Sequence, residues 1–245
     1  GAGKSTLLGL LLGWYRPAEG TVRVDGEVLN DDRLATVRAH TAWVDPAVQL
    51  WNRSFLDNIR YSLSSRAAVD LPDVLAKSSL QDMLARLPEG LQTLLGEGGA
   101  LVSGGEGQRL RLARALAQRH VRLAILDEPL RGLDREQRRI LLAAMRTHWN
   151  QQTLLCVTHD LEETLDFPRV LVVEQGRIIE DDCPKALNAR PDSRYRALLE
   201  ADQLVRQRTW QSSQWRRFRL VDGQLYAQHA TGRRKVVGIK RSIDV

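Results

Sequence analysis

Apolar and polar residues follow two different spacings along this chain, and each spacing predicts one kind of element. Residues 5–14 are apolar and rich in leucine, which predicts a buried helix that ends before Pro17. Residues 21–26 alternate between polar and apolar side chains, as in a strand closed by a turn. Short apolar runs at 41–44, 123–126 and 153–157 predict further strands, and the last two, which end in polar residues, are typical of central parallel strands.

Between these strands the apolar residues recur at helical spacing. Residues 55–86, interrupted at Pro72, predict a small helical subdomain, and residues 106–120 and 134–149 predict two longer helices. One more strand is expected at 170–173. Strands that alternate with helices indicate an α/β fold with a doubly wound, mainly parallel sheet.

Composition narrows the class of protein. Of 245 residues, 43% are hydrophobic, enough to bury a core. No run approaches the roughly 18 apolar residues that a membrane-spanning helix needs, and we find no signal peptide. The two cysteines, Cys156 and Cys183, are too few for a disulfide framework, so we expect a reducing, cytosolic setting.

The net charge of +6 is concentrated at one end of the chain. Residues 208–245 contain nine Lys or Arg and two acidic residues, so the rest of the chain carries a net charge of −1. Aromatic residues are interleaved with these basic ones. This basic extension could pack on its own body, lie against anionic lipid headgroups, or bind single-stranded nucleic acid.

The chain opens on a glycine-rich loop followed by a helix. Such a loop lets backbone N–H groups converge on phosphate oxygens. Here Lys4 would reach the β- and γ-phosphates, and the Ser5 hydroxyl would ligate Mg²⁺. The full pattern needs a glycine three residues before Gly1 and a buried strand before that, so we expect this sequence to be part of a longer chain. The predicted nucleotide-binding residues of this phosphate loop are Gly1, Ala2, Gly3, Lys4, Ser5 and Thr6.

Two acidic residues, Asp127 and Glu128, directly follow the apolar run at 123–126. Carboxylates at the end of a buried strand are costly unless a cation is near. We therefore expect Asp127 to hold Mg²⁺, through water, and Glu128 to act as the general base or to position the water that attacks the γ-phosphate.

A second anion-binding device stands at Ser103, Gly104 and Gly105, which precede a predicted helix. Two such devices do not easily face one nucleotide within one chain. Together with the phosphate loop and the acidic pair, this order of motifs resembles the nucleotide-binding domain of ATP-binding cassette (ABC) transporters, over roughly residues 1–180. In that family, ATP is held between the phosphate loop of one subunit and the signature loop of its partner.

The resemblance implies a role for each motif. It makes the fold a P-loop NTPase cassette with a helical subdomain at about 52–120 that carries the signature segment, here residues 102–108 with Val102 for leucine and Glu106 for glutamine. Glu106 thereby joins the predicted nucleotide-binding residues. Asp134 would contact the second subunit, and His159, in the switch segment 157–160, would be catalytic and touch the γ-phosphate. The implied cofactors are ATP and Mg²⁺, and the expected domains are 1–207 and a basic extension, 208–245.

Two positions depart from the family pattern. The expected Q-loop glutamine falls on Pro46, which has no side-chain donor or acceptor, and Asp45 or Gln49 could substitute for it. Glu106 brings a negative charge near the phosphates unless it turns outward or pairs with an arginine such as Arg109.

Residues 87–99 resemble the exporter-type segment in which a glutamate, here Glu97, lies near the intracellular loops of a membrane domain. We therefore expect an ATPase domain of an ABC exporter at the cytoplasmic face of the inner membrane. Its partners would be a transmembrane domain N-terminal on the same chain and a second ABC domain, with no nucleic acid. Two alternatives stay open: a soluble ABC ATPase acting on nucleic acid or ribosomes, and a regulatory cassette that binds ATP but hydrolyses it weakly.

Overall fold

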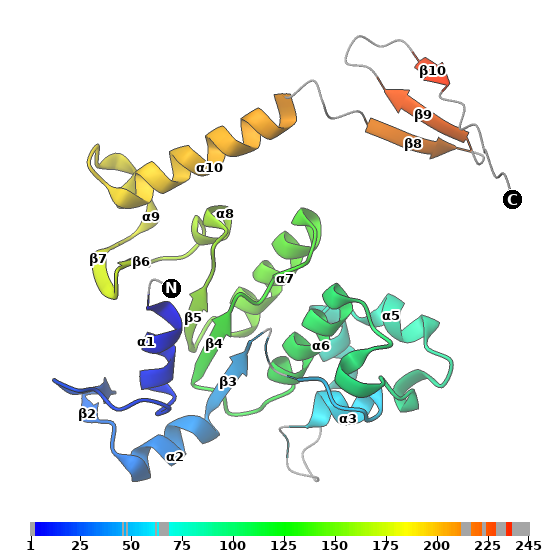
Figure 1. The fold of residues 1–245 in the computed structure, drawn as a ribbon. Helices are drawn as coiled ribbons and strands as arrows, with labels where there is room; N and C mark the ends of the chain where they lie inside the picture. Colours follow the sequence, from blue (N-terminus) through cyan, green and yellow to red (C-terminus); the bar gives the residue numbers. More distant parts are fainter. Residues whose placement is uncertain are drawn as a thin grey trace, which may run out of the picture. The chain divides into compact units, whose positions relative to one another are not determined.

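The computed structural model describes residues 3–45, 47, 49–61, 63, 69–211, 217–221, 224–228 and 234–236, with side chains through Val205. The chain forms two compact units, Gly1–Asn188 and Ala189–Val245. Figure 1 shows the elements of both units in chain order.

The centre of the first unit is a parallel sheet with the strand order β3-β4-β5. Its strands are β3 (Thr41–Val44), β4 (Leu123–Asp127) and β5 (Thr153–Val157). The prediction of parallel strands at 123–126 and 153–157 is confirmed, but only β4 is central, because β5 is the outer strand of the described sheet. The register places Asp127 opposite Val157. Parallel strands in register end at the same edge of the sheet, so the polar residues that follow β4 and β5 lie side by side.

Different elements cover the two faces of this sheet (Figure 1). Side chains alternate along each strand, so neighbouring residues face opposite sides. On one face, Trp43, Ile125 and Leu155 pack with Leu8 and Leu12 from α1 (Lys4–Leu11) and the residue after it. On the other face, the core contains residues of β3 and β4 together with leucines and alanines of α6 (Gly104–Leu116) and α7 (Arg135–His148). The expected doubly wound α/β fold is therefore present.

The predicted helices are present with shifted ends, whereas α2, α8 and α9 were not predicted. Pro72 lies in the first turn of α4, where its missing N–H costs nothing, so it begins a helix instead of breaking one. Capping decides two other starts, because Ser103 and Asp134 accept backbone N–H groups of α6 and α7. The remaining helices of this unit are α2 (Asp31–Ala39), α3 (Phe55–Arg60), α4 (Leu71–Lys77), α5 (Gln81–Arg86), η1 (Gly90–Gln92), η2 (Glu97–Gly99) and α8 (Leu161–Thr164), and α9 (Pro184–Ala189) reaches the boundary of the second.

Two antiparallel pairs flank the sheet. The strand expected at 21–26 is shorter than predicted, because Asp25 and Gly26 both adopt positive φ and turn the chain back after β1 (Arg23–Val24) into β2 (Glu27–Val28). A two-residue turn of this kind matches the twist of a hairpin. The strand expected at 170–173 is β6 (Val170–Glu174), which pairs with β7 (Arg177–Asp182).

A buried polar contact holds the helical part of the unit together. Asn58 is fully buried, and its amide donates to the backbone oxygens of Trp51 and Ser54. The guanidinium of Arg114, on α6, donates to the Asn58 carbonyl at 2.9 Å and to its side-chain oxygen at 3.2 Å. These contacts fix α3 against α6, and thus fix the helix that begins at the signature segment.

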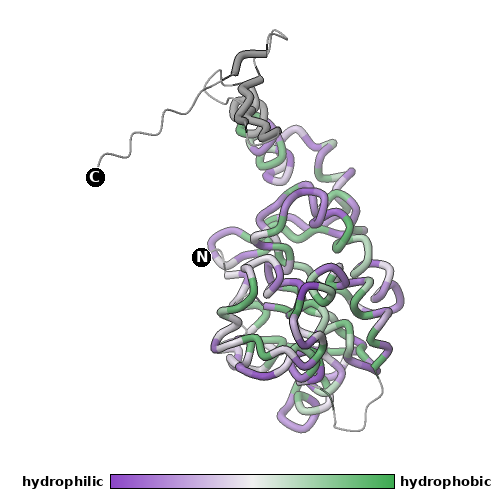
Figure 2. The backbone as a smooth tube through the Cα atoms, turned by 90° about the vertical axis from the view of Figure 1, so that its right-hand side faces the viewer, coloured by the Kyte–Doolittle hydropathy of each residue, from purple (hydrophilic) through white to green (hydrophobic). Residues whose placement is uncertain are grey.

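The second unit contains α10 (Arg194–Gln211) and a three-stranded antiparallel sheet of β8 (Arg217–Val221), β9 (Gln224–Gln228) and β10 (Arg234–Val236). The predicted domain boundary at 207/208 remains a prediction. Hydrophobic and hydrophilic residues are interspersed along the tube in Figure 2. Within the part of the chain that the structure describes, no helix has the length and apolar character to span a bilayer.

Candidate functional site

The phosphate loop leads into α1 through Gly3, a position that only a residue without a Cβ can occupy without strain. Gly3 has a φ of 95°, and a Cβ there would lie 3.1 Å from the Cα of Gly176 in the β6–β7 turn. Its carbonyl accepts the N–H of Leu7 at 3.0 Å, which starts the helix. Lys4, Ser5 and Thr6 form the first turn of α1. Gly1 and Ala2 lie outside the described residues.

A cavity of about 430 Å³ opens beside this turn, at the carboxyl ends of the parallel strands. It is the edge at which open α/β sheets bind ligands. The cavity brings together Ser5, Asp127 and Glu128 with Asp45, which the sequence offered in place of the Q-loop glutamine, and it adds Trp43. The Ser5 hydroxyl lies close enough to Asp127 to lower the pKa of its carboxyl.

The charge balance of this cavity fits a divalent cation. Burial raises the pKa of Asp127, and the nearby carboxylates of Asp45 and Glu128 raise it further, while Lys4 opposes them. Among the described residues, no cluster of three or more His, Cys, Asp or Glu is arranged to hold a metal. A hydroxyl and one or two carboxylates suit Mg²⁺, which keeps several waters and takes its other ligands from substrate phosphates.

Glu128 and His159 lie next to each other at the same edge. Glu128 has a φ of 43°, a left-handed conformation that is uncommon outside glycine, yet its N–H still donates to the Val157 carbonyl at 2.8 Å. His159 follows β5, and its Nε2 lies 2.8 Å from Oε1 of Glu128. Residues held in such uncommon backbone conformations cluster at functional sites.

The signature segment begins α6 with a capping box. The Ser103 N–H and hydroxyl donate to Glu106 Oε2 at 2.9 and 2.8 Å, and the Glu106 N–H donates back to Ser103 Oγ. The arginine that pairs with Glu106 is Arg86 of α5, at 2.7 Å, and not the Arg109 that we gave as an example. The hydrogen bond from the Ser103 backbone and the charge of Arg86 outweigh partial burial and lower the pKa of Glu106.

The first turn of α6 packs on the loop that follows Glu128. A Cβ at Gly105 would lie 3.1 Å from the Leu133 side chain, and the buried amide of Gln108 donates to the Pro129 carbonyl at 2.8 Å. Gly104 is exposed, with no atom near the position of a Cβ. Asp134 is exposed too and caps α7 through the N–H of Gln137, so it has a structural role beside the predicted one.

Sequence reasoning left the replacement of the Q-loop glutamine open between Asp45 and Gln49. Pro46 itself lies outside the described residues. Asp45 lines the cavity with Ser5 and Asp127, whereas the Gln49 carbonyl accepts a hydrogen bond from Arg114 in the helical part. Asp45 is thus the better placed of the two.

Other residues at the site had no local signal in the sequence. Tertiary packing alone brings Trp43 to the cavity and Arg86 to the signature segment. In the cavity Trp43 packs against Trp14, whose ring lies edge-on with 4.8 Å between the ring centroids. Only their aromatic or basic character could have suggested a role, and that character is shared by many other positions.

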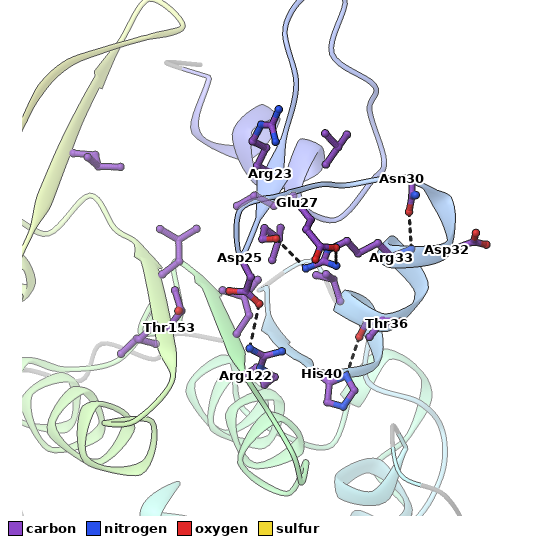
Figure 3. A pocket seen from close by; sticks show the side chains of 18 of the residues that line it. Arg23, Asp25, Glu27, Asn30, Asp32, Arg33, Thr36, His40, Arg122 and Thr153 are labelled. Carbon is purple, nitrogen blue, oxygen red and sulfur yellow. Dashed lines mark hydrogen bonds and ion pairs between the residues drawn. The ribbon is translucent and has the colours of Figure 1, made fainter.

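A larger cavity, of about 900 Å³, lies at the opposite, amino ends of β4 and β5 (Figure 3). Several of its charged groups pair with one another: Arg122 pairs with Asp25 at 3.1 Å, and Arg33 pairs with Glu27. His40 contacts the Thr36 carbonyl at 2.9 Å. Of the predicted site residues that the structure describes, none lines this cavity, so size alone is a poor guide to the functional site here.

Comparisons with known proteins agree with this geometry. ATP-dependent lipid A-core flippases from Pseudomonas fluorescens and Xylella fastidiosa are 39% and 37% identical to this chain over 181 and 191 residues. These alignments include 74% and 78% of this chain but 30% and 32% of the relatives. The chain thus spans about a third of the length of the curated relatives that it matches.

A solved structure gives the same result. A bacterial Atm1-family ABC exporter with ATP bound superposes with a TM-score of 0.76 at 30% identity, over 82% of this chain and 35% of the exporter. The family model described as ABC transporter matches residues 1–131, which is more than half of the chain. This chain therefore belongs to the ABC transporter family.

Proposed function

We propose that this chain is the ATP-binding and ATP-hydrolysing domain of an ABC membrane exporter, in which nucleotide-driven closure of two such domains powers transport. The observation that carries this proposal is the meeting of Ser5, Asp127, Glu128 and His159 at the carboxyl edge of one parallel sheet. A phosphate loop, a cation site and a base beside it are the parts that hydrolysis of a nucleoside triphosphate requires.

Each residue then has a role that its position supports. Backbone N–H groups at the start of α1 and the ammonium of Lys4 bind the phosphates. Ser5 and Asp127 would hold Mg²⁺, which neutralises charge on the phosphate oxygens when bound. Glu128 accepts a proton from the attacking water, and His159 orients Glu128 and donates towards the γ-phosphate. The carboxylates that raise the pKa of Asp127 would also attract a cation to it.

The two anion-binding helix ends support a dimer. α1 and α6 pack on opposite faces of the sheet, which argues against both N-termini gripping one nucleotide within a single copy. We therefore propose that Ser103, Gly104, Gly105 and Glu106 bind the nucleotide held by the phosphate loop of a second ABC domain. Asp134, exposed next to the buried Leu133, would contact that domain.

The surface next to Glu97 supports a membrane partner. Leu94 and Leu101 are 57% and 71% exposed on either side of η2. Both side chains are therefore accessible to an apolar surface of a partner. The relatives named above are a flippase and an exporter, so we place this chain at the cytoplasmic face of the inner membrane, beside a transmembrane domain on the same full-length chain.

One observation favours a second candidate, a regulatory domain that binds ATP with little turnover. The Ser103 hydroxyl and N–H are both engaged by the Glu106 carboxylate, so a phosphate has to compete for these donors. Under this candidate, nucleotide binds but phosphate release is slow even with Glu128 intact.

Phosphate release by the purified full-length protein, with Mg²⁺ and ATP, separates the candidates. We expect Glu128→Gln to lower kcat by about 10² to 10⁴ while nucleotide still binds, since the base is lost but the phosphate loop is intact. Glu19→Gln, an exposed glutamate outside the site, is the matched control. Equal phosphate release by the parent and Glu128→Gln, with ATP bound in both, would favour the regulatory candidate.

A further inference from the structure

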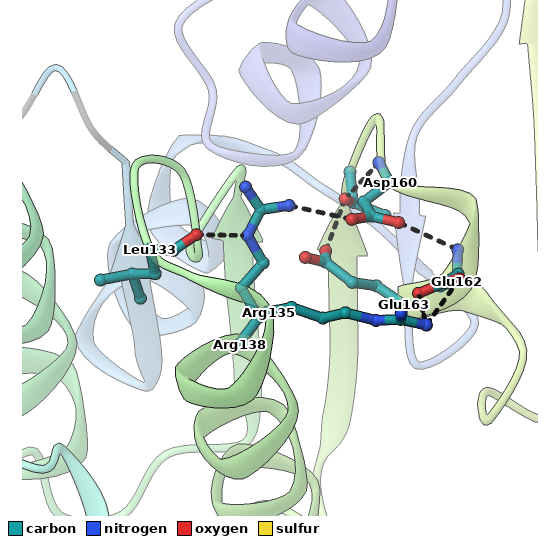
Figure 4. Close-up of polar contacts among 7 residues, drawn as sticks. Leu133, Arg135, Arg138, Asp160, Glu162 and Glu163 are labelled. Carbon is teal, nitrogen blue, oxygen red and sulfur yellow. Dashed lines mark hydrogen bonds and ion pairs between the residues drawn. The ribbon is translucent and has the colours of Figure 1, made fainter. Parts of the chain in front are cut away.

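Arg138 joins two loops that are far apart in the sequence (Figure 4). It projects from α7, and its Nε donates to the carbonyl oxygen of Leu133 at 2.8 Å. The other end of the same guanidinium donates to the Asp160 carboxylate at 2.9 Å. The Arg138 and Asp160 side chains are 33% and 19% exposed, so this contact is screened less than a surface ion pair.

Both loops carry a residue of the proposed site. Leu133 directly precedes Asp134, the proposed contact to the second domain, and Asp160 directly follows His159. The shape of the switch segment depends on Asp160, whose N–H donates to Thr158 Oγ1 at 3.0 Å and whose carboxylate caps α8 through Glu162. The Thr158 hydroxyl in turn donates to Glu163 at 2.6 Å. A shift of Asp160 therefore shifts the backbone that carries His159.

We propose that Arg138 is a positioning residue that couples the loop at Asp134 to His159, so that contact with a second domain sets the histidine against Glu128. This inference rests on the proposed function. A guanidinium suits the task because its donors lie in one rigid plane and hold two acceptors at a fixed separation. Lysine offers the same charge but only one compact group, and cannot fix both loops at once.

A neighbouring ion pair provides a matched control. Arg135 and Glu162 connect the same two helices, α7 and α8, at 2.9 Å, but the Arg135 side chain is 79% exposed and contacts no loop carbonyl that the structure records. If a link between α7 and α8 were all that mattered, removing either arginine would have a similar effect. The proposal requires the effects to differ.

The test measures kcat and KM for ATP, with Mg²⁺, in the full-length protein. The variants are Arg138→Lys, Asp160→Asn, their combination, and Arg135→Gln. We expect Arg138→Lys to lower kcat about tenfold or more, as misplaced catalytic groups do, while KM changes less than about twofold because the phosphate loop is untouched. The double variant should be no slower than the slower single one, because both act on the same link. Arg135→Gln should keep kcat within about twofold of the parent.

Thermal unfolding of each variant separates positioning from folding. The inference is overturned if the parent hydrolyses ATP and Arg138→Lys keeps the kcat of the parent. It is also overturned if the losses of kcat in Arg138→Lys and Asp160→Asn multiply in the double variant, or if Arg135→Gln is as slow as Arg138→Lys. A loss of kcat that follows a lower melting temperature also overturns it, since the role is then structural. A parent that does not hydrolyse ATP at all contradicts the proposed function itself, and that result is distinct from these.

Discussion

His159 Nε2 lies 2.8 Å from Glu128 Oε1, although the two residues follow different strands. The register of the parallel sheet explains this contact, because β4 and β5 pair with Asp127 opposite Val157. Each residue comes shortly after its strand ends, and parallel strands in register end together. The sheet thus brings a carboxylate and an imidazole into hydrogen-bond distance beside the phosphate loop.

The first prediction concerns this contact. His159→Ala should lower kcat for ATP hydrolysis by roughly 10² and leave ATP binding intact, because Glu128 loses the group that orients it. Phosphate release at saturating ATP measures the effect. His120→Asn is the control: His120 is exposed with a φ of 59°, a conformation that asparagine tolerates. Equal losses in both variants would show that the effect is not specific to the site.

The second prediction concerns the stability cost of Asp127. Burial and the charges of Asp45 and Glu128 raise its pKa in the folded protein. As pH rises from the ordinary pKa of an aspartate to this raised value, the folded state keeps a proton that the unfolded state has lost, so stability falls. Without Mg²⁺ and nucleotide, Asp127→Asn should therefore be more stable than the parent at neutral pH. The gain should shrink as the pH is lowered from the raised pKa towards the pKa of the unfolded chain, and it should be absent below that value, where both states are protonated.

Urea unfolding of both proteins between about pH 3 and pH 7 tests this sign. Added Mg²⁺ and ATP should stabilise the parent more than Asp127→Asn, since ligands stabilise the state that binds them. An Asp127→Asn variant that is less stable than the parent at pH 7, with no ligand, would contradict the prediction.

The third prediction concerns the Glu106–Arg86 pair at the signature segment. Arg86→Gln removes a cation that offsets the Glu106 charge. Its side chain is 69% exposed, so the change in KM for ATP should be modest, an increase of about two- to fivefold. In the Glu106→Gln background the same substitution should have no further effect, because the charge that it balances is gone.

Steady-state kinetics of the two single variants and the double variant give this coupling directly. Arg169→Gln is a fair control, because Arg169 is also 69% exposed and pairs with Asp181 at 2.6 Å, far along the chain from the signature segment. If Arg86→Gln has an undiminished effect in the Glu106→Gln background, Arg86 acts through some other contact.

The fourth prediction concerns the buried Asn58–Arg114 contact. Asn58→Ala removes the amide that donates to the buried Trp51 and Ser54 carbonyls, and it removes the side-chain oxygen that accepts from Arg114, whose guanidinium keeps the backbone carbonyl of residue 58. We expect a loss of about 2–4 kcal/mol in the free energy of unfolding. Urea unfolding measures it, and Asn52→Ala, at an exposed asparagine, should change stability by less than about 0.5 kcal/mol. Similar values for the two variants would mean that this contact contributes little.

Local patterns in the chain predicted the strands of the central sheet and the helices that cover it, but not α2, α8, α9, α10 or the strands after β6. The apolar runs at 123–126 and 153–157 predicted strands, and the structure contains them because short leucine-rich and β-branched runs suit a parallel sheet that is covered by helices. The helix predicted at 134–149 is α7, which Asp134 caps. Both the capping residue at its start and the helical spacing of its apolar residues are visible in the local sequence. The phosphate loop and the acidic pair were predicted for the same reason, since each motif consists of adjacent residues.

Contacts between segments that are distant in the sequence could not be predicted from such local patterns. Glu106 pairs with Arg86 and not with Arg109, because α5 passes close to the start of α6. The choice between Asp45 and Gln49 depended on where the chain goes after β3. Arg138 resembles the other arginines of α7 in the sequence, and only the fold aims it at two loops.

The sequence by itself therefore determined the strands of the central sheet, the main helices that cover it and the family, and it predicted the phosphate-binding chemistry. Those features depend on spacing within a few residues, which hydrophobic period, turn and capping preferences record. Only the tertiary structure decided which charges meet, which carboxylate is buried, and which side chains hold Glu128 and His159 in place. Such contacts arise from the packing of helices and strands remote in sequence, and no local pattern encodes their partners.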